Sequence, residues 1–187
     1  GGNIANGSPI GDTLPALIVL GATIVLRKGD RRRNLVLEDF FLDYQKQDRK
    51  PGEFIERIDI PTLDDDWRFG CYKVSKRFDQ DISAVTAAFA LQMKDGIIVN
   101  ARLCYGGMAP TPKRARAAEL ALTGAKWTTG AVEVAVLGLE IDFTPISDLR
   151  ATADYRNKVA CNLLRRFQIE TTQSNVETRL VGPMANV

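Results

Sequence analysis

Residues 1–12 form the segment of this chain best suited to bind a phosphate group. Their sequence, GGNIANGSPIGD, contains four glycines, two asparagines, a serine and an aspartate. Glycine-rich backbone adopts positive φ angles and lets a ligand come close to its N–H groups. A short helix predicted over residues 14–20 would add a favourable dipole for an anion at its N-terminus. On composition alone, the segment is either a ligand-binding loop or an ordinary flexible turn.

The chain has few residues of the types used in nucleophilic catalysis or metal binding. It contains no histidine, and its three cysteines, Cys71, Cys104 and Cys161, are far apart. Without C-x-x-C spacing we expect no zinc site, no iron–sulfur ligation and no Cys–His dyad. We therefore predict no catalytic residue and no metal site, and three reduced, buried, structural thiols.

Length and charge narrow the class of protein further. The chain has 187 residues, a net charge of +2 and 45% hydrophobic residues. That length suits one compact domain or two small subdomains, and the balanced charge argues against a nucleic-acid partner. No apolar stretch is long enough to cross a membrane and no signal-peptide pattern occurs, so we expect a cytoplasmic location. The absence of an initiating methionine suggests a piece of a longer protein.

The elements that position residues 1–12 are read from hydrophobic periodicity. Residues 22–28 alternate as a strand, and the basic run 28–33 is read as a solvated hairpin tip. Residues 54–60 are a second strand, in which Phe54, Glu56, Ile58 and Ile60 share one face. Residues 45–52 are read as a loop, and residues 62–66 as the boundary between two subdomains.

The second half of the chain predicts strands and then helices. Residues 67–74, 85–93 and 97–105 read as three antiparallel strands, and Asp95-Gly96 makes the hairpin turn between the last two. A helix over residues 84–93 is the alternative. Helices are predicted over 113–123, with Thr111 as N-cap, Pro112 at the first position and Gly124 at the end, and over 130–141 and 154–169. The fold class is therefore α+β, with a three-stranded antiparallel sheet packed with three helices.

Four separated motifs occur in one order: GGNIANGSPIGDTLPALIVLGA, YKVSKRFDQDISAV, ARLCYGGMAPTPKRA and DYRNKVACNLLRRF. Together they resemble the FAD-binding part of flavoproteins of the xanthine dehydrogenase type and of the related carbon monoxide dehydrogenase flavoprotein. The resemblance implies that residues 1–62 are the C-terminal part of an α/β FAD-binding subdomain. It implies a domain like the CO dehydrogenase flavoprotein C-terminal domain at residues 67–170, followed by a tail at 171–187.

The resemblance also implies a set of FAD contacts. The pyrophosphate and its neighbouring hydroxyls would meet the backbone or side chains of Gly2, Asn3, Ile4, Asn6 and Ser8. Asp12 would accept hydrogen bonds from sugar or ribityl hydroxyls. The residues themselves leave an alternative open, because Asn, Ser and Asp also serve routinely in turns and helix caps.

Two further side chains and two loops match the family. Ile55 would lie against the flavin ring, although an ordinary strand residue is the alternative. Lys73 would bring a cation to FAD, and a lysine on a mostly apolar strand is otherwise unusual. The loop 76–81 matches a region that affects the electrostatics near the flavin, and its alternative is a solvated loop with local ion pairs. Residues 106–108 are read as a structural tight turn.

The implied function is an FAD-binding segment of a xanthine dehydrogenase-type molybdenum hydroxylase, which passes electrons from iron–sulfur clusters through FAD to NAD. The iron–sulfur and molybdopterin groups would lie in other segments or subunits. In this family an earlier subdomain supplies a second glycine-rich loop, so this chain would hold half of the flavin site. The alternative is a non-catalytic packing or assembly module of a carbon monoxide dehydrogenase or aldehyde oxidase-like flavoprotein. The first interpretation requires that the N-terminal loop and Lys73 converge on one flavin.

Overall fold

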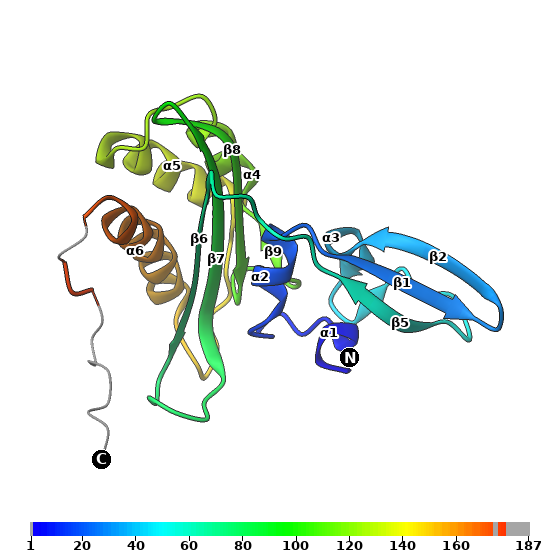
Figure 1. The fold of residues 1–187 in the computed structure, drawn as a ribbon. Coiled ribbons are helices and arrows are strands. Elements are labelled where there is room, and N and C mark those ends of the chain that lie inside the picture. Colours follow the sequence, from blue (N-terminus) through cyan, green and yellow to red (C-terminus); the bar gives the residue numbers. More distant parts are fainter. Residues whose placement is uncertain (1, 174–175, 179–187) are drawn as a thin grey trace, which may run out of the picture.

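The computed structural model describes residues 2–173 and 176–178, which form three antiparallel sheets and six helices (Figure 1). The first sheet, in the order β2-β1-β5, contains β1 (Thr23–Lys28), β2 (Arg31–Val36) and β5 (Phe54–Asp59). The second is a short pair, β3 (Phe41–Asp43) and β4 (Lys46–Gln47). The third, here called the central sheet, has the order β6-β7-β8-β9 and contains β6 (Trp67–Ser75), β7 (Ser83–Lys94), β8 (Ile97–Gly106) and β9 (Lys113–Arg114).

The helices are α1 (Gly2–Asn6), α2 (Leu14–Val19), α3 (Leu37–Phe40), α4 (Arg116–Leu122), α5 (Thr129–Asp142) and α6 (Ala153–Thr172). The predicted α+β class is confirmed. So are the predicted helix that follows the glycine-rich segment and the last two predicted helices. Both α5 and α6 begin with a threonine N-cap, Thr128 and Thr152, whose side-chain oxygen accepts a hydrogen bond from the backbone N–H three residues further on.

The central sheet lies between two layers, with α5 and α6 on one side and α2 on the other (Figure 1). Along β7, alternate residues face the two layers. Val85, Phe89 and Leu91 join the core under the helices, whereas Ala88 and Ala90 join the core around α2. Because both faces are buried, the strand reads as a continuous apolar run. This explains its alanine content, and the alternative reading of residues 84–93 as a helix is wrong.

The predicted helix over residues 113–123 is wrong in its first turn. Residues 113–114 form β9, which pairs with the end of β8 and adds a fourth strand to the predicted three. The helix starts at Arg116, so Thr111 is not its N-cap and Pro112 is not its first residue. The carboxylate of Asp142, on α5, accepts hydrogen bonds from the N–H groups of Ala117 and Ala118 at 3.0 and 3.1 Å. A side chain from another helix therefore satisfies the start of α4, which no local pattern predicts.

A bulge changes the predicted face of β5. The pairing with β1 shifts between Arg57 and Ile55, so Glu56 has no partner of its own on β1. The extra residue reverses the alternation, and Ile55 packs on the core around α2 together with Ile58. Phe54 is 53% exposed, so the prediction that it shares a face with Ile58 is wrong.

Three further predictions from the sequence, on the cysteines, on membrane-spanning segments and on the C-terminal tail, can be compared with the structure. Cys104 is buried, as predicted, but Cys161 is half-buried and Cys71 is exposed, because it lies on the edge strand β6. No helix among residues 2–173 is long and apolar enough to span a bilayer. The predicted tail begins inside α6, which continues to Thr172, and residues 174–175 and 179–187 lie outside the described residues.

Candidate functional site

Residues 7–12, here called the N-terminal turn, connect α1 to α2. Gly7 has a φ of 60°, and a Cβ at this position would overlap the ring of Phe41. Ser8 accepts two bonds inside the turn: its carbonyl oxygen from the N–H of Gly11 at 2.9 Å, and its side-chain oxygen from the N–H of Ile10 at 3.4 Å. The glycine-rich segment predicted as a loop is therefore helical in its first half and a fixed turn in its second.

A cavity of about 670 Å³ opens between this turn and the strands β4 and β5. Its wall combines polar side chains, backbone and apolar side chains, and is made by Ala5, Asn6, Gly7, Ser8, Pro9, Tyr44, Gln45, Gln47, Arg49, Glu53, Phe54 and Ile55. Small-molecule sites have this size and this mixture of an apolar wall with a few polar groups. The cavity therefore suits an organic ligand that carries both an apolar part and hydrogen-bonding groups.

The carboxylate of Glu53 places a negative charge at the wall of the cavity. Hydrogen bonds from the Arg33 guanidinium, at 2.9 and 3.0 Å, together with one from the Lys50 N–H, lower the pKa of Glu53 to about 2. Arg33 also donates to Asp48, so the basic hairpin is tied to the strands beside it. The reading of residues 28–33 as a purely solvated tip is wrong for Arg33.

At its other end the N-terminal turn is fixed to the central sheet by Asp12. The Nζ atom of Lys73, on β6, lies 2.6 Å from one Asp12 carboxylate oxygen, and the Oγ–H of Ser83, on β7, donates to the other. The side chains of Asp12 and Lys73 are 46% and 41% exposed, whereas Ser83 is buried. The turn and Lys73 are therefore in direct contact on the α2 side of the central sheet.

The glycines that end β8 bring the turn against the sheet. The N–H of Gly107 donates to the carbonyl of Pro9 at 2.6 Å. Gly107 has a φ of 81°, which side chains rarely adopt, and a Cβ at Gly106 would overlap the Thr86 hydroxyl. The prediction that residues 106–108 turn tightly is confirmed at Gly107. At Gly106 the glycine is needed for close approach.

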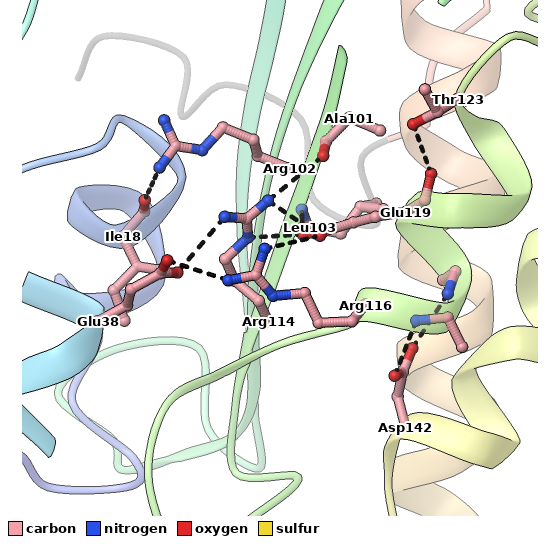
Figure 2. Close-up of polar contacts among 12 residues, drawn as sticks. Ile18, Glu38, Ala101, Arg102, Leu103, Arg114, Arg116, Glu119, Thr123 and Asp142 are labelled. Carbon is pink, nitrogen blue, oxygen red and sulfur yellow. Dashed lines mark hydrogen bonds and ion pairs between the residues drawn. The ribbon is translucent and has the colours of Figure 1, made fainter. Parts of the chain in front are cut away.

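Charged contacts hold the N-terminal region to the same sheet further along (Figure 2). Arg102, on β8, donates to the Ile18 carbonyl in α2 at 3.2 Å. Glu38, in α3, accepts from Arg116 at 3.0 Å and lies 3.5 Å from Arg114, which is itself paired with the buried Glu119. Together with Asp12, these contacts fix residues 2–60 against the central sheet at two places.

The loop between β6 and β7 is held mostly by local contacts. The Asp81 carboxylate accepts from the backbone of Arg77 and Ile82 and from the Arg77 guanidinium at 3.3 Å, and the first of these bonds contributes most to the lowered pKa of Asp81. Lys76 donates to the Leu149 carbonyl at 2.8 Å. The local ion-pair alternative for this loop therefore describes Arg77 and Asp81.

The structure places the predicted site residues in three groups. Asn6, Ser8 and Ile55 line the cavity, and Asp12 and Lys73 form the ion pair. Gly2, Asn3 and Ile4 lie in α1, where Ile4 packs on the core around α2, and they are not part of the cavity wall. Sequence reasoning missed three neighbours of these groups, namely Ser83, Tyr44 and Arg49. Among the described residues, no three His, Cys, Asp or Glu side chains are grouped to hold a metal ion.

Comparison with known protein families divides the chain into two matches. Residues 70–171, more than half of the chain, match the CO dehydrogenase flavoprotein C-terminal domain. Residues 1–63 match the FAD binding domain in molybdopterin dehydrogenase. The chain therefore belongs to the CO dehydrogenase flavoprotein C-terminal domain family, preceded by part of a molybdopterin dehydrogenase FAD-binding domain. The resemblance inferred from the four motifs is confirmed.

Individual relatives agree with this family. A xanthine dehydrogenase of Emericella nidulans is 33% identical over 97% of this chain, and the medium chain of a carbon monoxide dehydrogenase of Afipia carboxidovorans is 34% identical over 89%. The solved carbon monoxide dehydrogenase of Hydrogenophaga pseudoflava covers 89% of this chain with a TM-score of 0.83 at 29% identity. The chain spans 14% of the xanthine dehydrogenase and 57% of the medium chain, so it corresponds to a part of each.

The residues present fit an FAD group. Asn6, Ser8 and Gln47 supply hydrogen-bonding groups of the kind that pyrophosphate and hydroxyls require, and Tyr44, Phe54 and Ile55 supply an apolar wall for a flat ring. Lys73 adds a cation that is 41% exposed and thus accessible to a ligand. The cations that the described residues bring to this site are Arg49, in the cavity wall, and Lys73, in the ion pair with Asp12. The fit is partial, because Lys73 is already paired and only Arg49 of these two is left to face the charges of a pyrophosphate.

Proposed function

We propose that this chain supplies one side of an FAD site in a molybdenum hydroxylase of the xanthine dehydrogenase type. The observation that carries the proposal is the docking of the N-terminal turn on the central sheet, which joins the cavity wall to the Asp12–Lys73 pair through residues 8–12. FAD, when bound, supplies the electron-transfer chemistry, and the protein supplies binding, orientation and charge.

Each group of residues has a separate part in this proposal. Asn6 and Ser8 would bind polar atoms of the cofactor from the N-terminal turn, with Gly2, Asn3 and Ile4 of α1 contributing backbone beside them. Ile55 would pack against one side of the flavin ring. Asp12 would accept hydroxyl hydrogen bonds while it orients the Lys73 ammonium, whose charge favours electron density on a neighbouring ring.

The wider reaction sequence follows the same proposal. Electrons would reach FAD from iron–sulfur clusters and molybdopterin held by other segments or subunits, and NAD would accept them. A second cavity of about 500 Å³ shares Ser8, Pro9 and Tyr44 with the first and continues toward Met108 and Ile146. It offers space for an acceptor next to the proposed flavin position. We also propose residues 62–66 as the boundary between the two subdomains, because the first family match ends at residue 63 and the second begins at residue 70.

A packing role without flavin is the alternative. It is favoured by the complete aromatic core between the central sheet and α5 and α6, which needs no ligand to fill it. The chain is as similar to a carbon monoxide dehydrogenase medium chain, at 34% identity, as to a xanthine dehydrogenase, at 33%. A flavoprotein of the carbon monoxide dehydrogenase type is therefore the alternative full-length protein to which this segment would belong.

Titration of the full-length flavoprotein that contains this segment tests the proposal. Lys73→Met should weaken FAD binding by about tenfold or more, because a hydrogen bond to a charged group is worth roughly 1.5–3 kcal/mol. Lys94→Met is the matched control, since Lys94 is an exposed lysine at the far end of β7. Equal FAD affinity in wild type, Lys73→Met and Asn6→Ala would contradict the proposed site. The acceptor is tested separately in the wild-type protein with FAD bound. If NADH does not reduce the flavin but another acceptor reoxidises the reduced flavin, only the proposal that NAD is the acceptor is contradicted.

A further inference from the structure

A bulge at the start of β7 determines which way Ser83 faces. Val74 pairs with Val85 and Ser75 pairs with Ser83, so Ala84 has no partner of its own on β6. By strict alternation Ser83 would face the helices, as Val85 does. The extra residue turns Ser83 to the α2 side, where its hydroxyl meets Asp12.

The freed carbonyl of Ala84 is held from the opposite layer by Arg156. This arginine lies in the first turn of α6 and is 1% exposed. Its Nη1 donates to the Ala84 carbonyl and, at 2.9 Å, to the Gly107 carbonyl. Burial of a guanidinium is costly unless it is paired, and the partner here is Asp148, 2.8 Å from Nη2.

Asp148 is in turn fixed by its own loop. Its carboxylate accepts from the N–H groups of Arg150 and Ala151 at 2.9 and 3.1 Å. Burial opposes ionisation of this group, but these bonds and the one from Arg156 together hold the pKa of Asp148 below its usual range. The Arg156 guanidinium is therefore held rigidly at the end of the central sheet.

Both carbonyls bound by Arg156 lie next to atoms that hold the N-terminal turn. Ala84 follows Ser83, which binds Asp12, and the N–H of Gly107 itself binds the Pro9 carbonyl. α6 and α2 lie on opposite sides of the central sheet (Figure 1). Two short chains of contacts thus run from α6, through the end of the sheet, to residues 9–12.

We propose that Arg156 and Ser83 are positioning residues for the Asp12–Lys73 pair. Arg156 stabilises the bulge at Ala84, the bulge directs Ser83, and Ser83 holds one Asp12 oxygen so that the other stays on the Lys73 ammonium. This positioning role depends on the proposed function at one point only, namely that FAD contacts the Asp12–Lys73 pair. Neither residue lines the cavity between the N-terminal turn and β5, whereas Arg156 is part of the wall of the second cavity.

Two variants of equal shape isolate the Ser83 hydroxyl. Ser83→Thr keeps the hydroxyl and Ser83→Val replaces it with a methyl group, so both place the same bulk at a buried position. The first readout is the rate at which acetic anhydride acylates Lys73 in the flavin-free, full-length flavoprotein, measured by mass spectrometry. We expect Ser83→Val to raise that rate several-fold relative to Ser83→Thr, because Asp12 loses one of its two anchors.

Arg156→Lys tests the longer route, because lysine keeps the charge but has all its donors on one atom, whereas the two carbonyls bind Nη1 and Asp148 binds Nη2 of the guanidinium. It should raise the acylation of Lys73 and the exchange rate of the Gly107 N–H. Arg165→Lys is the control, since Arg165 is on the same helix and pairs with Glu133 at the surface. Where Arg156→Lys does not fold, the pair of Ser83 variants carries the test.

FAD affinity of the same variants is the second readout. A several-fold weaker affinity of Ser83→Val than of Ser83→Thr supports both the positioning role and the use of the pair by FAD. Changed Lys73 reactivity with unchanged FAD affinity supports the positioning role and contradicts the proposed function at Lys73. Equal Lys73 reactivity in Ser83→Thr and Ser83→Val overturns the positioning role of Ser83.

Discussion

The two faces of the central sheet are built differently. Toward α5 and α6, large side chains interlock: the ring centre of Phe89 lies 5.4 Å from those of Tyr105 and Phe167. Toward α2, the same strands present Ala88, Ala90, Cys104 and Gly106. The helix face is filled by side chains, whereas the α2 face is left small so that backbone can come close.

This difference separates stability from positioning. The helix face contains the larger cluster of buried apolar residues and should carry most of the free energy of folding. The α2 face brings the N-terminal turn to within hydrogen-bond distance of Gly107 and Ser83. Substitutions on the two faces should therefore affect different properties of the molecule.

The largest effect is expected from Phe89→Ala on the helix face. Phe89 is fully buried, and its removal should lower the free energy of unfolding by about 3–5 kcal/mol, measured by urea denaturation. Phe69→Ala is the control, because Phe69 is on the neighbouring strand and is 44% exposed. A loss for Phe89→Ala no larger than for Phe69→Ala would show that the aromatic core does not dominate stability.

Two substitutions to leucine at adjacent positions of β7 test the two faces of the central sheet separately. Ala87 and Ala88 are both 0% exposed and face the helices and α2, respectively. Leucine at either position should cost about 1–3 kcal/mol through overpacking. In hydrogen exchange, Ala88→Leu should reduce protection of α2 before that of α6, and Ala87→Leu the reverse. The same order of exchange in both variants would contradict the two-layer account.

A smaller effect is expected where charges join the layers. Glu38→Gln removes the carboxylate that accepts from Arg116, but Arg114 keeps its pairing with Glu119, so the cost should be about 1 kcal/mol or less. In hydrogen exchange, Glu38→Gln should reduce the protection of α2 and α3 only. Glu133→Gln, which breaks a surface pair with Arg165 on the helix side, should leave α2 and α3 unchanged.

The smallest effect is a pH dependence located in the N-terminal region. The pKa of Glu53 is about 2 in the folded protein, because Arg33 and Lys50 donate to its carboxylate, against about 4.3 when unfolded. The stability it contributes is complete above the unfolded pKa and is lost as the pH falls toward 2. Glu53→Gln should therefore flatten the acid side of a plot of Tm against pH. Identical acid limbs for wild type and Glu53→Gln would contradict this.

Sequence reasoning succeeded where local chemistry decides the structure. The hairpin between β7 and β8 follows from Asp95 and Gly96, which have φ angles of 52° and 76°. The last two helices were predicted from their apolar residues, and in the structure each also has a local cap, Thr128 or Thr152, which the sequence analysis did not name. In each case the stabilising partner is a few residues away, so the pattern can be read directly.

It failed where a distant partner decides. The bulges at Glu56 and Ala84 reverse the facing of Ile55 and Ser83, and the start of α4 depends on Asp142. Motif resemblance brought Asp12 and Lys73 together, but Ser83 was missed because a serine at a strand start carries no signal of its own. The same strand also carries Thr86, a buried hydroxyl for which the described residues supply no hydrogen-bond partner, so a hydroxyl in β7 does not by itself indicate one.

The most direct test of the account is an experimental structure of the full-length flavoprotein with FAD bound. We expect the flavin beside Ile55, with Lys73 still paired to Asp12 and directed at the cofactor, and the pyrophosphate against the N-terminal turn. Cofactor density elsewhere, out of reach of both Ile55 and Lys73, would contradict the claim that the docked turn and the central sheet form one flavin site.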